Sequence, residues 1–377
     1  MQRTSFSVFA ENYINEEREA LSNIAPFLKS AFTPTVFKST GFPTEVYESD
    51  AELWKLIDSM HEARYHANLK MLGGLTNYEF ELFKEVVHIS ISFGKILKHP
   101  IIPRNSLTRS LLSFRAINSF YEASSTKPSV FEIGPGSGYL ALLCHLAGWK
   151  YTAMDSTGSL CQFQNSLWNH AGINVKFGDV SAEFSQIPWW KFVDLEIELP
   201  NSQIVVANHV IFEMTPLALS YSVQRLKEAG AEYLFSEGMG LSRYPTNIDI
   251  IKKTMVLIHN TVSTTKSQQV AVFQFKQSNL GKQSKHKVIY KKLYSMFSNF
   301  YHRYYYITAI KYFGIIYRKF FSKKNPLKAQ VLDKRLNIPS IDVSEGQVSD
   351  WIHSLGFPTL TRDEEVIIYS RHTGHYW

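Results

Sequence analysis

The sequence predicts an α/β protein with a parallel sheet, and three observations support this prediction. From residue 126 onward, short apolar segments alternate with segments that have the apolar periodicity of helices, as in a doubly wound sheet. The first apolar segment, 130–133, runs directly into a glycine-rich turn and a helix, and the second, 151–154, ends in Asp155. A strand, a glycine turn and a helix N-terminus together form a cradle for a nucleotide-like ligand.

The predicted elements of this region follow in a regular order. Strands are expected at 130–133, 151–154, 174–177, 203–207 and 232–235, with helices at 139–147, 159–170 and 216–229. The polar and aromatic stretch 187–201 is interpreted as a loop. A helix over 348–358 and a strand over 366–372 are expected to complete the sheet near the C-terminus.

The first 125 residues are expected to form a helical cap ahead of the sheet. Apolar residues recur at intervals of three and four in 15–30, 50–72 and 106–123, and Thr76 is expected to begin another helix. The predicted organisation is therefore a helical cap (1–125), a ligand-binding α/β domain (126–245), a basic aromatic insertion (246–345), and a C-terminal helix and strand (346–377).

The composition is typical of a globular protein in a reducing compartment. Hydrophobic residues make up 45% of the 377 residues, and no run of 18 charge-free apolar residues indicates a membrane-spanning helix. The two cysteines, Cys144 and Cys161, fall in predicted helices, which favours buried, reduced thiols over a disulfide. The N-terminus lacks the apolar core of a signal peptide, so a cytoplasmic location is expected.

The net charge of +7 conceals a basic segment within a mildly acidic chain. Residues 250–332 contain sixteen Lys or Arg and no Asp or Glu, and within 276–328 the lysines are interspersed with Phe and Tyr. Three interpretations remain open: helices on an anionic membrane surface at the inner face, a nucleic-acid-binding segment, or a helical subdomain with a solvated basic face. The continuous aromatic runs favour the membrane surface over nucleic acid.

The glycine-rich turn carries a resemblance to a known family. Residues 132–138 read E-I-G-P-G-S-G, which differs from the GxGxxG fingerprint of dinucleotide-binding folds. This turn, followed by an acid after the second strand and another after the third, resembles the class I S-adenosylmethionine-dependent methyltransferases. The resemblance implies a Rossmann-like sheet and S-adenosylmethionine as the cofactor. It assigns these residues to the cofactor: Glu132, Gly134, Gly136, Gly138, Asp155, Asp179 and Asn208.

The resemblance also implies individual roles. The three glycines are expected to pack against the methionine end of the cofactor, and Asn208 is expected to contact its amino end or the acceptor. Asp155 is expected to hold the ribose hydroxyls, as acids after a second strand do in related sheets. Asp179 is expected to lie beside the adenine.

The same resemblance places the acceptor site after the fourth strand. His209 is the candidate general base, because an imidazole accepts a proton near neutral pH, and Glu213 is the candidate to orient it or share the proton. The alternative is a loop histidine bonded to backbone and a carboxylate at a helix N-terminus. The segment NHVIFEM lacks the Pro-Pro-aromatic sequence of enzymes that methylate base amino groups, which argues against a flipped base as acceptor.

Arg104, Arg109 and Arg115 are candidate contacts for a carboxylate or phosphate of the acceptor, and the alternative is that most of them are solvated or paired with acidic residues. The histidines show no metal-ligand spacing, so no metal is predicted.

The sequence is also similar to the sugar O-methyltransferases of bacterial surface-polysaccharide gene clusters. The similarity covers about residues 100–240 and rests on EIGPGSGYLALL, MDST, NHVIFEM and SEGMG. It implies methyl transfer to a hydroxyl of a nucleotide-linked sugar, a lipid-linked sugar or a growing glycan. The alternatives are an N- or carboxyl-methyltransferase of a small metabolite or peptide, an RNA methyltransferase, and a non-catalytic S-adenosylmethionine-binding protein.

Overall fold

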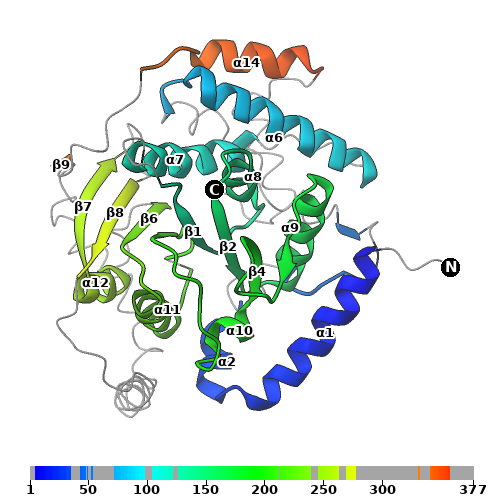
Figure 1. Ribbon diagram of the computed structural model, residues 1–377, viewed down its shortest axis with the longest axis vertical. Coiled ribbons are helices and arrows are strands. Elements are labelled where there is room, and N and C mark those ends of the chain that lie inside the picture. Colours follow the sequence, from blue (N-terminus) through cyan, green and yellow to red (C-terminus); the bar gives the residue numbers. More distant parts are fainter. Residues whose placement is uncertain are drawn as a thin grey trace, which may run out of the picture. The chain divides into compact units, whose positions relative to one another are not determined.

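The protein is built around a sheet whose first six strands run parallel (Figure 1). The computed structural model describes residues 5–34, 43–47, 49, 52–53, 72–97, 104–121, 126–211, 213–238, 245–262, 269–276, 330–331 and 340–356. The helices and strands in these ranges belong to one unit, formed by residues 1–275 and 329–377. Three predicted features lie outside the described residues: most of the helix over 50–72, the strand over 366–372, and the basic aromatic stretch 277–328.

Nine strands are described. They are β1 (Ser129–Ile133), β2 (Lys150–Asp155), β3 (Lys176–Phe177), β4 (Phe184–Pro188), β5 (Ile204–Val206), β6 (Tyr233–Gly238), β7 (Met255–Val262), β8 (Gln269–Phe275) and β9 (Gln330–Val331). Their order in the sheet is β3-β4-β2-β1-β5-β6-β8-β7-β9. β8 runs antiparallel to β6 and β7, and β9 runs antiparallel to β7. The predicted first, second, fourth and fifth strands are confirmed to within a few residues.

The strand beside β2 differs from the prediction. β4 pairs in parallel with β2 and ends with Pro188 opposite Asp155. The predicted third strand, 174–177, is reduced to the two residues of β3, one position further out in the sheet. The apolar pattern does not reveal β4, because its buried centre consists of Ser185 and Gln186.

Two more strands come from the segment that was expected to form an insertion. β7 and β8 form a hairpin within 246–345, and β8 pairs with the whole of β6. This pairing corrects one expectation: the insertion does not stand apart from the sheet from residue 246 onward, because β8 lies beside the fifth predicted strand. The segment QVAVFQF has the alternation of a strand, but the basic charge around it favoured a separate subdomain.

Helices cover both faces of the sheet (Figure 1). One face carries α7 (Arg104–Tyr121), α8 (Tyr139–Leu146) and α9 (Gly158–His170), and the other carries α10 (Trp189–Val193), α11 (Pro216–Glu228) and α12 (Pro245–Thr254). A further layer outside the first face consists of α6 (Asn77–Ile96) and α14 (Glu345–Ser354). The helices predicted at 139–147, 159–170, 216–229 and 348–358 are confirmed, and Thr76 is the N-cap of α6.

The N-terminal helices pack directly on this framework. α1 (Ser5–Asn23) and α2 (Pro26–Phe32) replace the single helix predicted over 15–30, since Pro26 lacks an N–H group and suits the first turn of a new helix. α1 contacts α9 and α10, and α2 contacts α11. Residues from α6 and α7 join the main hydrophobic core, so the region 1–125 is part of the same unit as the sheet.

The core fills the space between the sheet and α7 and α8. Val130, Tyr151 and Ile204 stand side by side on one face of three neighbouring strands and are at most 1% exposed. Leu111 and Phe114 of α7 pack in the same cluster, and both are fully buried. Burial of this apolar surface stabilises the strand ends that carry the candidate site.

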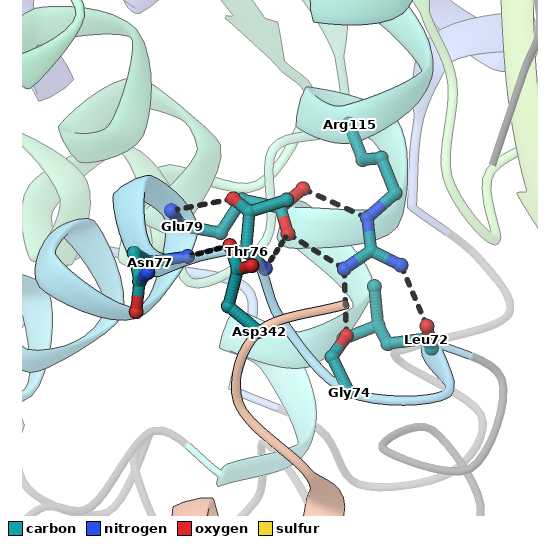
Figure 2. A network of polar contacts seen from close by, with 7 residues as sticks. All are labelled: Leu72, Gly74, Thr76, Asn77, Glu79, Arg115 and Asp342. Carbon is teal, nitrogen blue, oxygen red and sulfur yellow. Dashed lines mark hydrogen bonds and ion pairs between the residues drawn. The ribbon is translucent and has the colours of Figure 1, made fainter. Parts of the chain in front are cut away.

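Arg115 of α7 ties α7 to the start of α6 (Figure 2). Its guanidinium donates to both carboxylate oxygens of Glu79, at 2.7 and 2.6 Å, and to the carbonyl oxygens of Leu72 and Gly74. Glu79 also accepts a hydrogen bond from the Thr76 backbone, which completes a capping box at the start of α6. Arg115 is therefore a structural anchor, which corrects the prediction that it is a candidate contact for the acceptor.

The C-terminal helix is attached beside the same network. Asp342 accepts a hydrogen bond from the Asn77 backbone at 2.9 Å, and Leu75 forms an antiparallel bridge with Val343 (Figure 2 shows the Asp342 contact). Trp351 of α14 packs against the Phe83 ring of α6. α14 therefore extends the helical layer.

Both cysteines are buried and free, as predicted for reduced thiols. Within the part of the chain that the structure describes, no helix is both long enough and apolar enough to span a membrane.

Candidate active site

The order of the strands creates a switch point between β1 and β5. From β1 the chain moves outward to β2 on one side, and after β4 it returns to β5 on the other side of β1. The connections that follow β1 and β5 therefore run to opposite faces and part at the carboxyl ends of these strands. Ligands of open α/β sheets bind in the crevice at this position. The glycine loop follows β1 and His209 follows β5, so the fold brings together two predicted parts of the site.

The backbone conformation of the glycine loop disfavours residues that carry side chains. Gly134, Gly136 and Gly138 all have positive φ, at 62°, 57° and 75°. A Cβ on Gly134 would lie 2.5 Å from a methyl group of Val210, whereas a Cβ on Gly136 would meet nothing within 4 Å. The loop thus packs closely against the turn after β5 and leaves open space above Gly136.

Asp155 lies at the end of β2 and is fixed by the protein. Its Oδ1 accepts from the Thr157 backbone at 2.9 Å, and its Oδ2 accepts from Gln164 Nε2 at 3.1 Å. Gln164 also donates to the Gly136 carbonyl at 2.8 Å, so this buried α9 side chain joins the acid to the glycine loop. Sequence reasoning missed Gln164, whose only signal was its position two turns into the helix after Asp155.

Glu132 is buried beside Asp155. Tyr151 donates its hydroxyl proton to Glu132 Oε2 across 2.5 Å. Burial raises the pKa of Glu132 to about 8; the Tyr151 hydrogen bond opposes this rise and the nearby Asp155 adds to it. Burial also raises the pKa of Asp155 to about 6, against the hydrogen bonds from Thr157 and Gln164. A cationic ligand bound at this end of the sheet would therefore favour the ionised forms of Glu132 and Asp155.

His209 is paired with Glu237, a residue at the end of β6 that sequence reasoning missed. Its Nε2 lies 2.9 Å from Glu237 Oε2, and its backbone N–H donates to the Glu237 carbonyl at 2.7 Å. Burial acts to raise the pKa of Glu237, but His209 and then Arg109 outweigh burial and hold this pKa below its ordinary value. The signal for Glu237 was the acid in the SEGMG segment that follows the fifth predicted strand.

The backbone of His209 is unusual. Among the described residues that are not glycine, His209 alone has a positive φ, of 58°. Such a conformation costs of the order of 1 kcal/mol and persists where the surroundings enforce it, often at functional sites. Here the double link to Glu237 enforces it.

Asn208 is used to hold the site together. Its Oδ1 accepts from the Glu237 backbone at 3.1 Å, and its amide group exchanges hydrogen bonds with Ser113 of α7. Asn208 therefore joins the ends of β5 and β6 to α7. The contact predicted for it, with the cofactor or the acceptor, stays a prediction.

Glu213 does not take the role predicted for it as the partner of His209, since that partner is Glu237. Burial and then Asp155 raise the pKa of Glu213 to about 7, and Arg109 opposes the rise. Arg109 therefore lies within electrostatic reach of both Glu213 and Glu237. Its buried Nε has no hydrogen-bond partner among the described residues. Arg104 is the first residue of α7.

Asp179 is not brought to the other candidates. It is exposed, and its carboxylate accepts hydrogen bonds from the backbone and the hydroxyl of Ser181 in its own turn. β4 separates β3, which precedes Asp179, from β2. The residues that follow the strand next to β2 are Trp189 and Trp190 at the start of α10. The predicted place of Asp179 beside the adenine does not agree with this arrangement.

The raised pKa of Glu213 has a measurable consequence for stability. Its pKa rises from an ordinary 4.5 to about 7 on folding, so the folded state binds the proton more tightly than the unfolded state. The protonated Glu213 carboxyl makes its full contribution to the stability of the folded state below about pH 4.5, and this contribution is lost as the pH rises through 7. We expect Glu213→Gln to match the parent at pH 4.5 and to exceed it by about 3 kcal/mol at pH 8. Urea unfolding at both pH values measures this, and a difference independent of pH would contradict it.

In the described ranges, no three His, Cys, Asp or Glu side chains gather in an arrangement that could hold a metal ion.

Comparisons with known proteins add similarities of fold only. No family model and no curated protein matches the chain. Among solved structures, a TehB-like SAM-dependent methyltransferase from Corynebacterium glutamicum is 13% identical, with a TM-score of 0.33, over 45% of this chain and 94% of that chain. N-methyltransferase NodS from Bradyrhizobium japonicum, in complex with S-adenosylhomocysteine, is 14% identical, with a TM-score of 0.33, over 45% and 88%. Magnesium protoporphyrin IX methyltransferase from Synechocystis, with bound SAM, is 10% identical, with a TM-score of 0.35, over 46% and 83%.

Proposed function

We propose that the chain is an S-adenosylmethionine-dependent methyltransferase that acts on a hydroxyl group. One observation carries the proposal: the glycine loop and the β5 turn with its His209–Glu237 pair meet at the switch point of a doubly wound sheet, with Asp155 one strand away. The loop and Asp155 serve the cofactor in this proposal, and the pair serves the acceptor.

The residues present suit this cofactor. The open space above Gly136 accepts a ligand close to the backbone, and Asp155 offers carboxylate lone pairs to two neighbouring hydroxyls. Glu132, Asp155 and Glu213 favour a ligand with positive charge, because a cation relieves the cost of ionising acids in a buried site. A sulfonium with an adjacent ammonium group has that charge.

Bound S-adenosylmethionine supplies a methyl group on a positively charged sulfur, ready for displacement. The work left to the chain is to orient the acceptor, exclude water and remove one proton. In this proposal His209 Nε2, which lies 2.9 Å from Glu237 Oε2, carries the proton, and Nδ1 acts as the base. His209 Nδ1 then takes the hydroxyl proton, and Glu237 stabilises the imidazolium that forms.

The histidine–carboxylate pair favours a hydroxyl over a carboxylate as the acceptor. A hydroxyl keeps its proton at neutral pH and gains reactivity when a base removes it, whereas a carboxylate acceptor has no proton to lose. The sugar or glycan acceptor predicted from sequence remains the first choice among hydroxyl compounds. The membrane-surface interpretation rests on 276–328, which the structure describes only at Lys276.

An acceptor screen tests the proposal. The protein is incubated with methyl-labelled S-adenosylmethionine and with matched panels of nucleotide sugars, glycans, amines and carboxylates, and the products are analysed by mass spectrometry. We expect a mass gain of one methyl group on a hydroxyl compound. Transfer confined to amines or carboxylates would refute the hydroxyl acceptor and leave the cofactor assignment in place.

A further inference from the structure

The N-terminal helix α1 lies against the turn that carries Asp155. A Cβ built on Gly158, the first residue of α9, would lie 3.0 Å from the Tyr13 ring of α1. The segment that follows α2 also contacts α9, because the Ser159 hydroxyl of α9 donates a hydrogen bond to the Pro43 carbonyl. Asp155 itself is 4% exposed. Tyr13 of α1 therefore lies close to the turn that carries Asp155.

Tyr13 has a buried hydroxyl that the protein leaves almost unused. The side chain is 3% exposed, and its hydroxyl has no hydrogen-bond partner among oxygen and nitrogen atoms of the described residues. The hydroxyl lies beside the Cys161 thiol, a weak partner, and within electrostatic reach of Asp155. A buried hydroxyl without a strong partner destabilises the folded state, and phenylalanine would fill the same space without that penalty.

The attachment of α1 to the adjoining helix is made by side chains. The Tyr13 ring meets the edge of the Trp190 ring at a centroid distance of 4.7 Å. Trp189 donates to Glu17 at 3.1 Å, and Lys191 lies 3.9 Å from Glu16. The last of these pairs is partly exposed and contributes little. These contacts hold Tyr13 in place beside the turn that carries Asp155.

We propose that α1 is a lid over the ribose end of the cofactor site, and that the Tyr13 hydroxyl is a hydrogen-bond partner of the bound cofactor at Asp155. This inference rests on the cofactor part of the proposed function. It explains why a tyrosine stands where a phenylalanine would pack equally well. It also places a binding residue in a region that the sequence pattern marked only as helical.

Tyr13→Phe tests the inference through two readouts of opposite sign. The variant loses a buried hydroxyl whose only partner in the described residues is the weak Cys161 thiol, so the melting temperature of the ligand-free protein stays unchanged or rises. It also loses a hydrogen bond to the ligand, so calorimetric titration with S-adenosylhomocysteine gives a Kd that is about fivefold to tenfold weaker.

Tyr221→Phe is the matched control. The hydroxyl of Tyr221 is equally buried but is satisfied by the Val193 carbonyl at 2.7 Å. We expect this variant to melt at a lower temperature and to bind the ligand with unchanged affinity. An unchanged Kd for Tyr13→Phe would overturn the inference, as would a weaker Kd accompanied by a lower melting temperature of the ligand-free variant. If the parent protein binds no S-adenosylhomocysteine, the proposed function itself fails and the inference falls with it.

Discussion

His209→Asn is expected to lower kcat for hydroxyl methylation by about 10²–10⁴-fold, the contribution of a positioned general base. Asparagine is the appropriate replacement, because it tolerates the positive φ of 58° at this position better than alanine does. The variant should keep its fold and its affinity for S-adenosylmethionine. The comparison requires kcat with the hydroxyl acceptor from the screen, together with a titration of the cofactor.

Two further variants define the role of the pair. Glu237→Gln keeps the shape of the side chain and removes the carboxylate that holds His209, so an intermediate loss of kcat is expected. Asp179→Asn is the control, since the exposed Asp179 is bonded within its own turn, and its kcat should stay within a few-fold of the parent. Turnover by His209→Asn within threefold of the parent would mean that transfer proceeds by orientation alone.

Arg115→Ala is expected to lower the free energy of unfolding by about 3–5 kcal/mol, the cost of leaving a buried carboxylate without its partner. Glu79 is 4% exposed and loses both hydrogen bonds from the guanidinium, while the Leu72 and Gly74 carbonyls lose their donors. Arg115→Lys keeps the charge but not the planar fork, so it should recover part of the loss. Urea unfolding at pH 7 measures all three proteins.

A more exposed ion pair on α6, the helix that carries Glu79, is the control for Arg115. Lys84 and Glu81 lie 2.7 Å apart with side chains that are 27% and 69% exposed, so Lys84→Ala should change stability by no more than about 1 kcal/mol. The double variant Glu79→Gln with Arg115→Met removes both charges together and should be more stable than Arg115→Ala. Equal unfolding midpoints for Arg115→Ala and Lys84→Ala would contradict the structural role of the network.

Much of the α/β region could be predicted because local signals agree there. The strand, glycine turn and helix over 129–146 combine apolar burial, positive φ at each predicted glycine and a helix start, and all of them are observed. Asp155 and His209 were predicted from their positions at strand ends, and the strand order brings those ends to one edge of the sheet.

The remaining features depend on contacts between distant segments. Glu237 contacts His209, and Gln164 contacts Gly136; in each pair the two residues lie 28 positions apart in the chain. Spacing rules within one helix cannot reveal contacts between such distant residues. β4 was missed because its buried Ser185 and Gln186 are satisfied by hydrogen bonds to other elements. Asp179 was misplaced because the prediction did not include β4.

Calorimetric titration with S-adenosylmethionine, on the parent, Asp155→Asn and Asp179→Asn, tests the central claim most directly. Asp155→Asn keeps an oxygen for the Thr157 backbone but loses the charge, and the loss of charged hydrogen bonds should weaken the Kd by about 10- to 100-fold. Asp179 is exposed and bonded within its own turn, so Asp179→Asn should bind as the parent does. The account predicts saturable binding by the parent and this contrast between the two variants. Absence of binding by the folded parent, or equal binding by Asp155→Asn, would contradict it.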